Sequence, residues 1–310
     1  MEAMGVKILV IFTGGTIGST INGEYISSDE NKPYVILEQF NKKFPNSIEW
    51  ETKSPYTILS ENATVGTYGL LAASVKEGLR KDFDGIIITH GSDTLQYSAA
   101  FLSLILGTDT IPVLLVSSNY VLEDERANGM DNFAAAVDFI CNGYGRGVFV
   151  PYKNTDENVR IHCGEKLMPH NLYSDYLYSL DDEFYGEYRE NGFSFNNVLR
   201  EDIKPFKEPD YSINDTEIYS VYARPGNVYP NQIEGIKKVL LHAYHGGTFC
   251  VEDDKFKKFI EKLKHKGIPV YLIGGNPETD YDSCRSYEKM GIEVMGHISP
   301  IYAYMKLWVN

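Results

Sequence analysis

Short apolar runs alternate with segments of helical periodicity along the first half of the chain. Strand-like runs occupy Val6–Phe12, Gly85–Thr89, Pro112–Val116 and Gly147–Val150, and a helical pattern covers Asn128–Cys141 between the last two. Near-continuous runs of β-branched residues joined by helices are typical of parallel strands that are buried on both faces. The pattern therefore predicts an α/β domain with a mostly parallel sheet flanked by helices.

This alternation stops between about Tyr173 and Pro209. The segment is rich in Asp, Glu, Tyr and Asn, and it ends in a stretch with two prolines. Polar, proline-containing segments often mark domain boundaries. We therefore predict a large N-terminal domain over residues 1–192, followed by a linker over residues 193–212.

Strand-like runs resume after the predicted linker, at Ile218–Tyr222, Val239–Ala243 and Val270–Ile273, and a helical pattern covers Asp253–Lys266. Alternating strands and helices of this kind predict a second, smaller α/β domain over residues 213–310. A chain of 310 residues is long for one hydrophobic core and sufficient for two domains.

Composition argues against some classes of binding partner. The net charge of -14 argues against nucleic acid and against an anionic membrane surface, because both attract basic proteins. The apolar run near the amino terminus lacks the basic leader and small-residue cleavage site of a signal peptide, and no run approaches the roughly 18 apolar residues of a membrane span. The four cysteines include no C-x-x-C pair, which favours reduced thiols. We expect a cytoplasmic protein.

Candidate chemistry gathers in two turns that each follow a predicted strand. Residues 13–16 read T-G-G-T and residues 90–94 read H-G-S-D-T. The carboxyl ends of neighbouring parallel strands meet at one edge of a sheet, where ligands bind in such folds. The turns are therefore expected to bring Thr13, Thr16, Ser92, Asp93 and Thr94 to one cleft. Taken alone, a glycine-rich turn between strand and helix is more often a plain connection or a phosphate nest.

The two turns together resemble the bacterial-type L-asparaginase family, whose pattern reads T-G-G-T-I and H-G-T-D-T. The sequence Gly145–Val148 is similar to the family's R-G-V strand entry, and Asn128, Gly129 and Asn132 are similar to its D-G-x-x-N helix start. The resemblance implies a cytoplasmic-branch amidohydrolase that acts on a small amino-acid amide and needs no metal or organic cofactor. It also implies a homodimer or homotetramer with active sites near a subunit interface.

The resemblance assigns the catalytic roles. Thr13 is expected to be the nucleophile, and Tyr25 corresponds to the flexible-loop tyrosine that would hydrogen-bond it, with residues 18–29 as a lid. Ser92 stands where most relatives have Thr, and Asp93 is expected to bind the substrate's α-ammonium group. Lys166 is expected to complete the second triad with Ser92 and Asp93, with Lys153 as the rival position.

Further binding residues follow from weaker matches. Ser60, with Glu61 beside it, resembles the family serine that receives the substrate α-carboxylate. In the second domain, the family's G-x-G-N turn reads His245–Thr248 here, so Thr248 and, less directly, Tyr281 are the candidates for contact with a neighbouring subunit's site.

Alternatives remain at the level of sequence. The first hypothesis is hydrolysis of L-asparagine to L-aspartate and ammonia. The second is a glutaminase-asparaginase, or an amidase acting on another side-chain amide such as a tRNA-linked one. The third is a non-catalytic amino-acid-binding protein. A metal pair at His242 and His245 is disfavoured because residues three apart on a strand point to opposite faces, and His90 is expected to have a structural hydrogen-bonding role.

Overall fold

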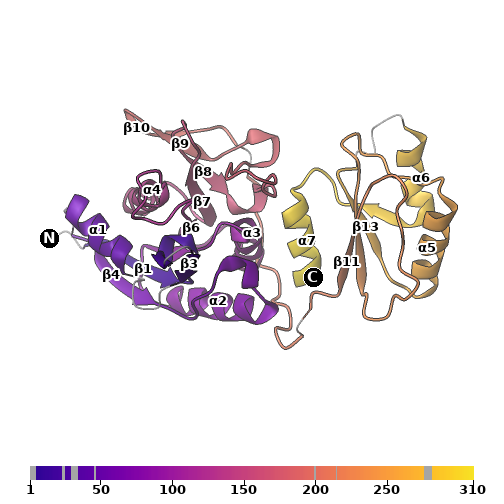
Figure 1. Cartoon of the computed structure of the whole chain (residues 1–310), viewed down its shortest axis with the longest axis horizontal. Coiled ribbons are helices and arrows are strands. Elements are labelled where there is room, and N and C mark those ends of the chain that lie inside the picture. Colours follow the sequence, from indigo (N-terminus) through magenta and orange to yellow (C-terminus); the bar gives the residue numbers. More distant parts are fainter. Residues whose placement is uncertain are drawn as a thin grey trace. The chain divides into compact units, whose positions relative to one another are not determined.

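The computed structural model describes residues 5–22, 25–28, 34–44, 47–198, 200–213, 215–275 and 281–310, without the side chains of residues 18–22 and 25–28. The chain divides into two compact units, Met1–Asn214 and Asp215–Asn310, which are the indigo-to-pink and orange-to-yellow parts of Figure 1. Each unit contains its own sheet and its own hydrophobic core.

The first unit is built on an eight-stranded sheet with the order β10-β9-β8-β7-β6-β5-β1-β4. Five neighbouring strands are parallel, and the three strands beyond β7 are antiparallel. The parallel strands are β1 (Lys7–Phe12), β4 (Glu49–Lys53), β5 (Gly85–Thr89), β6 (Val113–Val116) and β7 (Val148–Lys153). The antiparallel strands are β8 (Val159–Cys163), β9 (Gly186–Arg189) and β10 (Gly192–Phe195).

Helices cover both faces of this sheet. Helices α1 (Val35–Lys43) and α4 (Gly129–Cys141) supply buried side chains to a core on one face. Helix α2 (Val65–Gly78) lies on the other, because its Gly78 packs closely against Leu9 and Ile86. Helix α3 (Leu95–Leu106) packs against α2, and the ring centroids of Tyr68 and Phe101 lie 5.1 Å apart.

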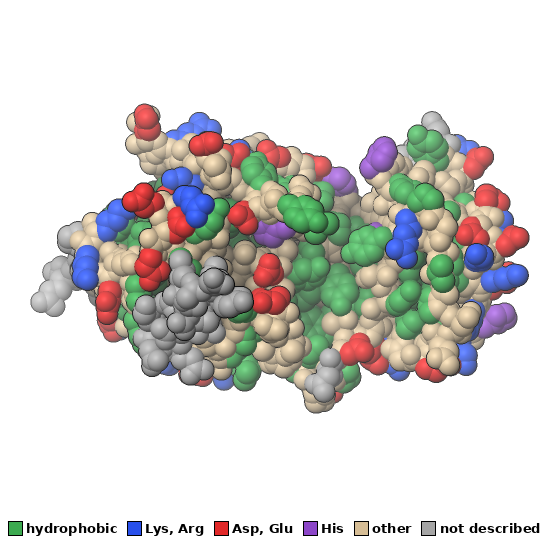
Figure 2. Space-filling model, viewed as in Figure 1, with side chains coloured by type: hydrophobic (Ala, Val, Ile, Leu, Met, Phe, Trp, Pro, Cys, Tyr) green, Lys and Arg blue, Asp and Glu red, His purple; other side chains and the backbone are tan. Residues whose placement is uncertain are grey.

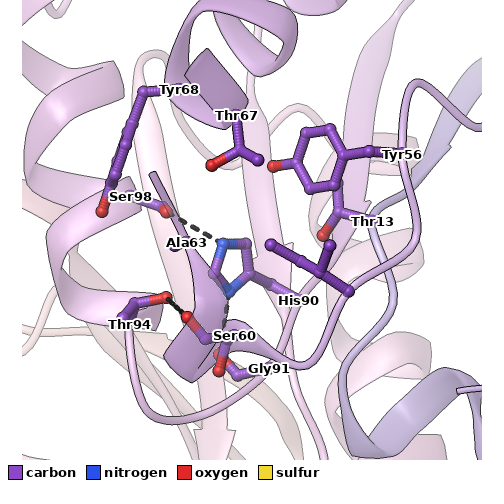
Figure 3. Close-up of a pocket in the computed structure, with 11 residues that line it drawn as sticks. Thr13, Tyr56, Ser60, Ala63, Thr67, Tyr68, His90, Gly91, Thr94 and Ser98 are labelled. Carbon is purple, nitrogen blue, oxygen red and sulfur yellow. Dashed lines mark hydrogen bonds between the residues drawn. The ribbon is translucent and has the colours of Figure 1, made fainter. Parts of the chain in front are cut away.

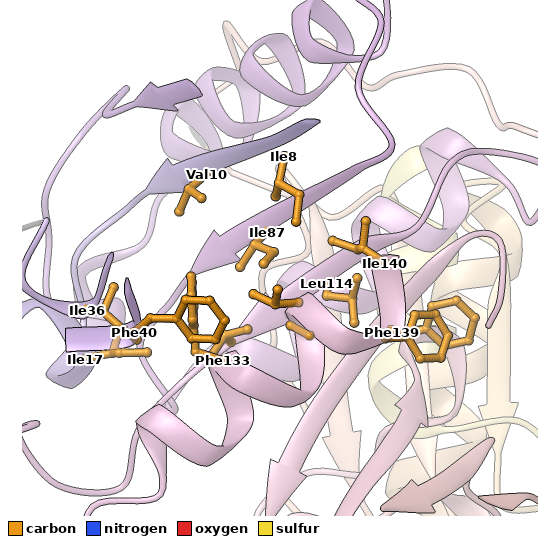
Figure 4. Close-up of a cluster of buried hydrophobic side chains, with 14 of the residues drawn as sticks. Ile8, Val10, Ile17, Ile36, Phe40, Ile87, Leu114, Phe133, Phe139 and Ile140 are labelled. Atoms are coloured by element: carbon orange, nitrogen blue, oxygen red, sulfur yellow. The ribbon is translucent and has the colours of Figure 1, made fainter. Parts of the chain in front are cut away.

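The core against α1 and α4 explains the strand pattern (Figure 4). Ile8 and Val10 of β1 and Ile87 of β5 meet Phe40 of α1 and Phe133 of α4 there. Alternate residues of each strand point to opposite faces, and both faces are covered, so the inner strands β1, β5 and β6 are almost entirely apolar rather than apolar at every second position. The edge strand β4 reads EWETK and is more exposed.

The second unit is a smaller layered structure. Its sheet has the order β11-β12-β13-β14, and all neighbours are parallel. The helices α5 and α6 pack on one face of this sheet and α7 on the other. The bounds are β11 (Ile218–Tyr222), β12 (Lys238–His242), α5 (Asp254–His265), β13 (Val270–Ile273), α6 (Asp282–Met290), β14 (Ile292–Val294) and α7 (Pro300–Val309).

The predicted fold class is confirmed, whereas β4 and β8 are regular strands that the sequence pattern did not predict. The predicted strands at 85–89, 218–222 and 270–273 have the observed bounds. The segment around 173–209, where the alternation stops, contains β9 and β10. The rest of the predicted linker packs on the first unit. Phe206 N donates to Leu104 O at 2.9 Å, and Ile203 is buried.

Charged side chains of both signs are scattered over the viewed face of the described residues, without one basic patch (Figure 2). All four cysteine thiols are free. Within the described ranges, no helix combines the length and the apolar character that crossing a bilayer requires.

A buried histidine makes the stability of the first unit depend on pH. His162 of β8 is fully buried, and its Nδ1 lies 2.8 Å from Ser179 Oγ. Among the described residues its Nε2 atom has no hydrogen-bond partner. Burial lowers the pKa of His162 to about 3, and the positive charge of Arg160 acts in the same direction.

We predict that this histidine lowers the free energy of unfolding on acidification. Below the unfolded pKa of about 6.5 the unfolded chain binds a proton that the folded chain excludes until about pH 3, so stability falls as the pH falls. Between pH 7.5 and 5.5 the loss should be about 1.4 kcal/mol from this group. In a Trp308→Phe background, Trp50 fluorescence during denaturant unfolding isolates the first unit. His162→Gln should lack this part of the pH dependence, and an unchanged dependence would contradict the assignment.

Candidate active site

Three backbone segments meet at the carboxyl ends of β1 and β5. These strands are parallel neighbours, with Phe12 paired to Thr89. A Cβ atom on Gly15 would lie 2.3 Å from the backbone nitrogen of Gly91, and one on Gly91 would lie 2.4 Å from Ser60 Oγ. The two turns that the sequence singles out are therefore in contact with each other. The segment at Ser60 packs against the second turn, at Gly91.

Thr13 occupies the end of β1 with its hydroxyl held by backbone. The side chain is 3% exposed, and Oγ1 donates to Thr89 O at 2.6 Å. Thr13 O accepts from Ile58 N at 3.1 Å, and Gly15 N donates to Ile58 O at 3.0 Å. Gly14, with φ of 99°, makes this pairing possible because a side chain there would strike Ile58 O at 2.3 Å.

A small pocket opens beside Thr13 (Figure 3). It encloses about 260 Å³ of space between atoms, part of it open to solvent. The part of its wall that the described residues form is rich in hydroxyl groups and carries no carboxylate, lysine or arginine. The lining residues are Thr13, Tyr56, Ile58, Ser60, Ala63, Thr67, Tyr68, His90, Gly91, Thr94 and Ser98.

His90 fixes the turn that follows β5. Its Nδ1 lies 2.8 Å from Gly91 O and its Nε2 lies 2.9 Å from Ser98 Oγ. A carbonyl oxygen only accepts, so Nδ1 carries the proton and Nε2 accepts from the Ser98 hydroxyl. Burial lowers the pKa of His90, which keeps the ring neutral. These contacts agree with the structural role expected for this residue.

The other predicted site residues differ in their exposure to solvent. Ser92 is half-buried, Asp93 is exposed, and neither lines the pocket. Ser60 is buried at the start of the single helical turn Ser60–Asn62, whereas Glu61 is exposed. Thr94 Oγ1 donates to Ser60 O at 3.1 Å, which ties the Ser60 segment to the start of α3.

The two candidate lysines are engaged in ion pairs outside the pocket. Lys166 ends the short helical turn Gly164–Lys166 and pairs with Glu183. Lys153 Nζ lies 2.6 Å from Asp131 Oδ2. Neither lysine lines the pocket.

Beside Lys166, a buried ion pair anchors the helical turn. The Arg200 guanidinium donates to both Glu165 carboxylate oxygens, from Nε at 2.7 Å and from Nη2 at 3.1 Å. Arg200 Nη1 also donates to Arg146 O at 2.6 Å. A bidentate pair of this kind holds the backbone of the turn in place, so the position of Lys166 is set by its neighbour in sequence.

Three predicted contacts cannot be placed in this pocket. Tyr25 belongs to β3 (Tyr25–Ser28), which pairs with β2 (Ser19–Asn22), and its side chain lies outside the described residues. Thr248 and Tyr281 belong to the second unit. Within the part of the chain that the structure describes, no group of three or more His, Cys, Asp or Glu side chains is arranged to hold a metal ion.

Sequence reasoning missed four lining residues that carry a hydroxyl group. Tyr56 precedes the Ser60 segment, Thr67 and Tyr68 belong to the first turn of α2, and Ser98 lies on α3. None belongs to either glycine-rich turn. The available signal was weak: the T-x-x-T spacing of Thr64 and Thr67, whose side chains cap α2 reciprocally, predicts a helix start and no more.

The close contact at Gly91 gives a prediction about stability. In Gly91→Ala the new methyl group would collide with Ser60, and overpacking of this kind costs about 1–3 kcal/mol. Gly66→Ala in α2 is the matched control, because its nearest neighbour is 3.7 Å away. Adding Ser60→Gly should restore part of the loss, measured as a double-mutant cycle by denaturant unfolding. Equal stabilities of the two alanine variants would contradict the tight apposition.

Comparisons with known proteins identify the family of this chain. The family model "Asparaginase, N-terminal" matches residues 7–171. A glutamyl-tRNA(Gln) amidotransferase subunit from Thermococcus kodakarensis is 31% identical over 321 residues, covering 98% of this chain and 71% of the relative. The corresponding amidotransferase subunit from Haloquadratum walsbyi is 28% identical over 170 residues, which are 52% of this chain and 36% of that relative. The matched part of this chain thus spans about a third of the length of the H. walsbyi protein.

Solved structures show the same fold at low sequence identity. The thermostable L-asparaginase from Thermococcus kodakarensis superposes with a TM-score of 0.78 at 20% identity, over 98% of this chain and 92% of that chain. A probable cytoplasmic L-asparaginase from Campylobacter jejuni gives 0.76 at 23% identity, over 98% and 94%. L-asparaginase I from Vibrio cholerae gives 0.80 at 19% identity, over 98% and 92%. With the family model matching more than half of its residues, the chain belongs to the asparaginase family.

Proposed function

We propose that this protein hydrolyses the side-chain amide of a free amino acid, with L-asparagine as the first candidate substrate, through an acyl-enzyme on Thr13. The observation that carries the proposal is the position of Thr13. It lies at the carboxyl end of a parallel strand, in the wall of a pocket, against the turn that bears Ser92 and Asp93. Ligands of open α/β sheets bind at such strand ends.

The reaction assigns a role to each side chain. Thr13 Oγ1 attacks the amide carbon, the C–N bond breaks, and the departing nitrogen leaves as ammonia with the proton that Thr13 gives up. Water then attacks the ester, and Oγ1 is restored as a hydroxyl. A threonine hydroxyl is a weak nucleophile at its ordinary pKa, so a neighbouring base must accept its proton. In this proposal Ser92 relays the proton, with Lys166 lowering the cost of that step.

Substrate recognition would fall to polar groups around the turns. The exposed carboxylate of Asp93 suits an α-ammonium group through a charge-assisted hydrogen bond. Ser60 and Glu61 stand where the α-carboxylate would be received. Tyr25 would close the site from the β2–β3 hairpin, and Thr248 of a neighbouring subunit would complete it in a homo-oligomer.

A second candidate function has its own support. The Thermococcus kodakarensis relative that matches 98% of this chain is an amidotransferase subunit. Hydrolysis of glutamine, or of another side-chain amide, is therefore the alternative on the same nucleophile. One methylene in a pocket changes binding by only about 1–3 kcal/mol, so the two amides must be compared directly.

We expect Thr13→Ala to abolish ammonia release with L-asparagine or L-glutamine while the fold persists. Loss of a nucleophile typically lowers kcat by several orders of magnitude. Thr13→Ser, which keeps a hydroxyl, is the matched control and should retain measurable turnover. Ammonia release by the purified protein with each amide, beside circular dichroism of both variants, makes the test. Near-normal activity of Thr13→Ala would remove the nucleophile assignment.

The two lysines provide a paired prediction. Lys166→Met should lower kcat nearly as much as Thr13→Ala, because it removes the positive charge that favours proton loss at Ser92. Lys153→Met removes a lysine with a similar ion pair in the same unit and should leave kcat within about threefold, as expected for a surface pair. Steady-state kinetics of both variants decides between them. The reverse order of effects would transfer the role to Lys153.

A further inference from the structure

Negative charge on Thr13 Oγ1 calls for a hydrogen-bond donor, and the side chain of Tyr25, the donor expected from the family resemblance, lies outside the described residues. The proton of Thr13 itself points to Thr89 O at 2.6 Å. That carbonyl accepts hydrogen bonds and donates none, so it cannot stabilise negative charge on Oγ1. Charge appears on Oγ1 twice in the proposed cycle, when it attacks the amide and when it leaves the ester.

Several donors in the pocket wall are already engaged. The hydroxyls of Thr67, Thr94 and Ser98 donate to Thr64 O, Ser60 O and His90 Nε2 respectively. The ring proton of His90 goes to Gly91 O. These groups hold the wall together and are not directed to Thr13.

The Tyr56 side chain lies over Thr13. Both residues line the pocket, and the Tyr56 hydroxyl points into it between Thr67 and Thr13 (Figure 3). Burial raises the pKa of Tyr56, and a side-chain hydrogen bond with Thr13 offsets part of the rise. The phenol therefore keeps its proton at neutral pH, which makes it a donor and excludes it as a general base.

The backbone fixes Tyr56 relative to the nucleophile. Ile58, two residues further on, exchanges hydrogen bonds with Thr13 O and Gly15 N at 3.1 and 3.0 Å. Tyr56 therefore sits on a segment bonded directly to the turn it serves. The β2–β3 hairpin that carries Tyr25 is a separate element, so the position of Tyr56 does not depend on that hairpin.

We propose that Tyr56 is a catalytic residue, which donates a hydrogen bond to Thr13 Oγ1 whenever that oxygen carries negative charge. The inference rests on the amide hydrolysis proposed above. No proton is transferred from the phenol. In acylation the bond from Oγ1 to the acyl carbon forms as the C–N bond breaks, and in deacylation water forms the new C–O bond as Oγ1 leaves with its electron pair. Tyr56 stabilises Oγ1 in both steps.

The test compares Tyr56→Phe, Tyr25→Phe and Tyr185→Phe by steady-state kinetics with the better amide substrate. Removing one preorganised donor to a developing oxyanion lowers kcat by about 10²–10³-fold. Tyr56→Phe should show such a loss, with KM changed by less than about threefold, because the interaction forms in the transition state. Tyr185→Phe is the matched control. Its half-buried side chain donates to Tyr144 O at 3.0 Å, and its ring does not line the pocket.

A direct readout of Thr13 reactivity separates chemistry from folding. An electrophilic amino-acid analogue that alkylates hydroxyl nucleophiles is mixed with each variant, and mass spectrometry follows labelling of the peptide that contains Thr13. We expect Tyr56→Phe to slow labelling strongly and Tyr185→Phe to leave it unchanged, with both unfolding at similar temperatures.

The outcomes distinguish the two proposals. Wild-type kcat and labelling in Tyr56→Phe, with Thr13→Ala inactive, would overturn the role of Tyr56 and leave the proposed function standing. The same holds if Tyr25→Phe alone reproduces the loss. Activity that persists in Thr13→Ala removes the nucleophile and, with it, the role given to Tyr56.

Discussion

The close contact between two glycine-containing turns is the constraint on which the candidate site depends. Parallel pairing of β1 and β5 brings residues 13–15 and 90–92 to one edge, where a Cβ atom on Gly15 would strike the Gly91 backbone and one on Gly91 would strike Ser60. Because the backbones of these two turns are in direct contact, the position of Thr13 is fixed. A nucleophile gains most from geometry that is fixed before the substrate arrives, and here the backbone provides this geometry.

Helix packing on both faces of the sheet stabilises that edge. The inner parallel strands β1, β5 and β6 are apolar on both faces because α1 and α4 cover one face and α2 and α3 the other. At the ends of β1 and β5, hydroxyls and the neutral ring of His90 hydrogen-bond to one another and to backbone carbonyls. Among the described residues, the pocket wall holds hydroxyl groups and a neutral His90 but no carboxylate, lysine or arginine, whereas Asp93 is exposed outside it.

Strand pairing also explains which parts of the fold were predictable. The runs 85–89 and 270–273 are buried parallel strands whose apolar composition is required by their own position. In contrast, β9 and β10 form an antiparallel hairpin whose residues are mostly half-buried or exposed. Their sequences, GEYR and GFSF, contain no continuous apolar run, and the pairing of β9 with β8 and of β10 with β9, rather than the local pattern, makes them strands.

The sequence by itself determined the fold class and the two turns that meet, because apolar runs and glycines act locally and strand ends of a parallel sheet must converge. It also pointed to Thr13 through a motif. Only the tertiary structure placed Tyr56 and Ser98 in the same pocket, paired Lys166 with Glu183, and left Asp93 outside the pocket wall. These relations join residues from separate elements, and side-chain direction and ion-pair choice follow from packing, which no local pattern encodes.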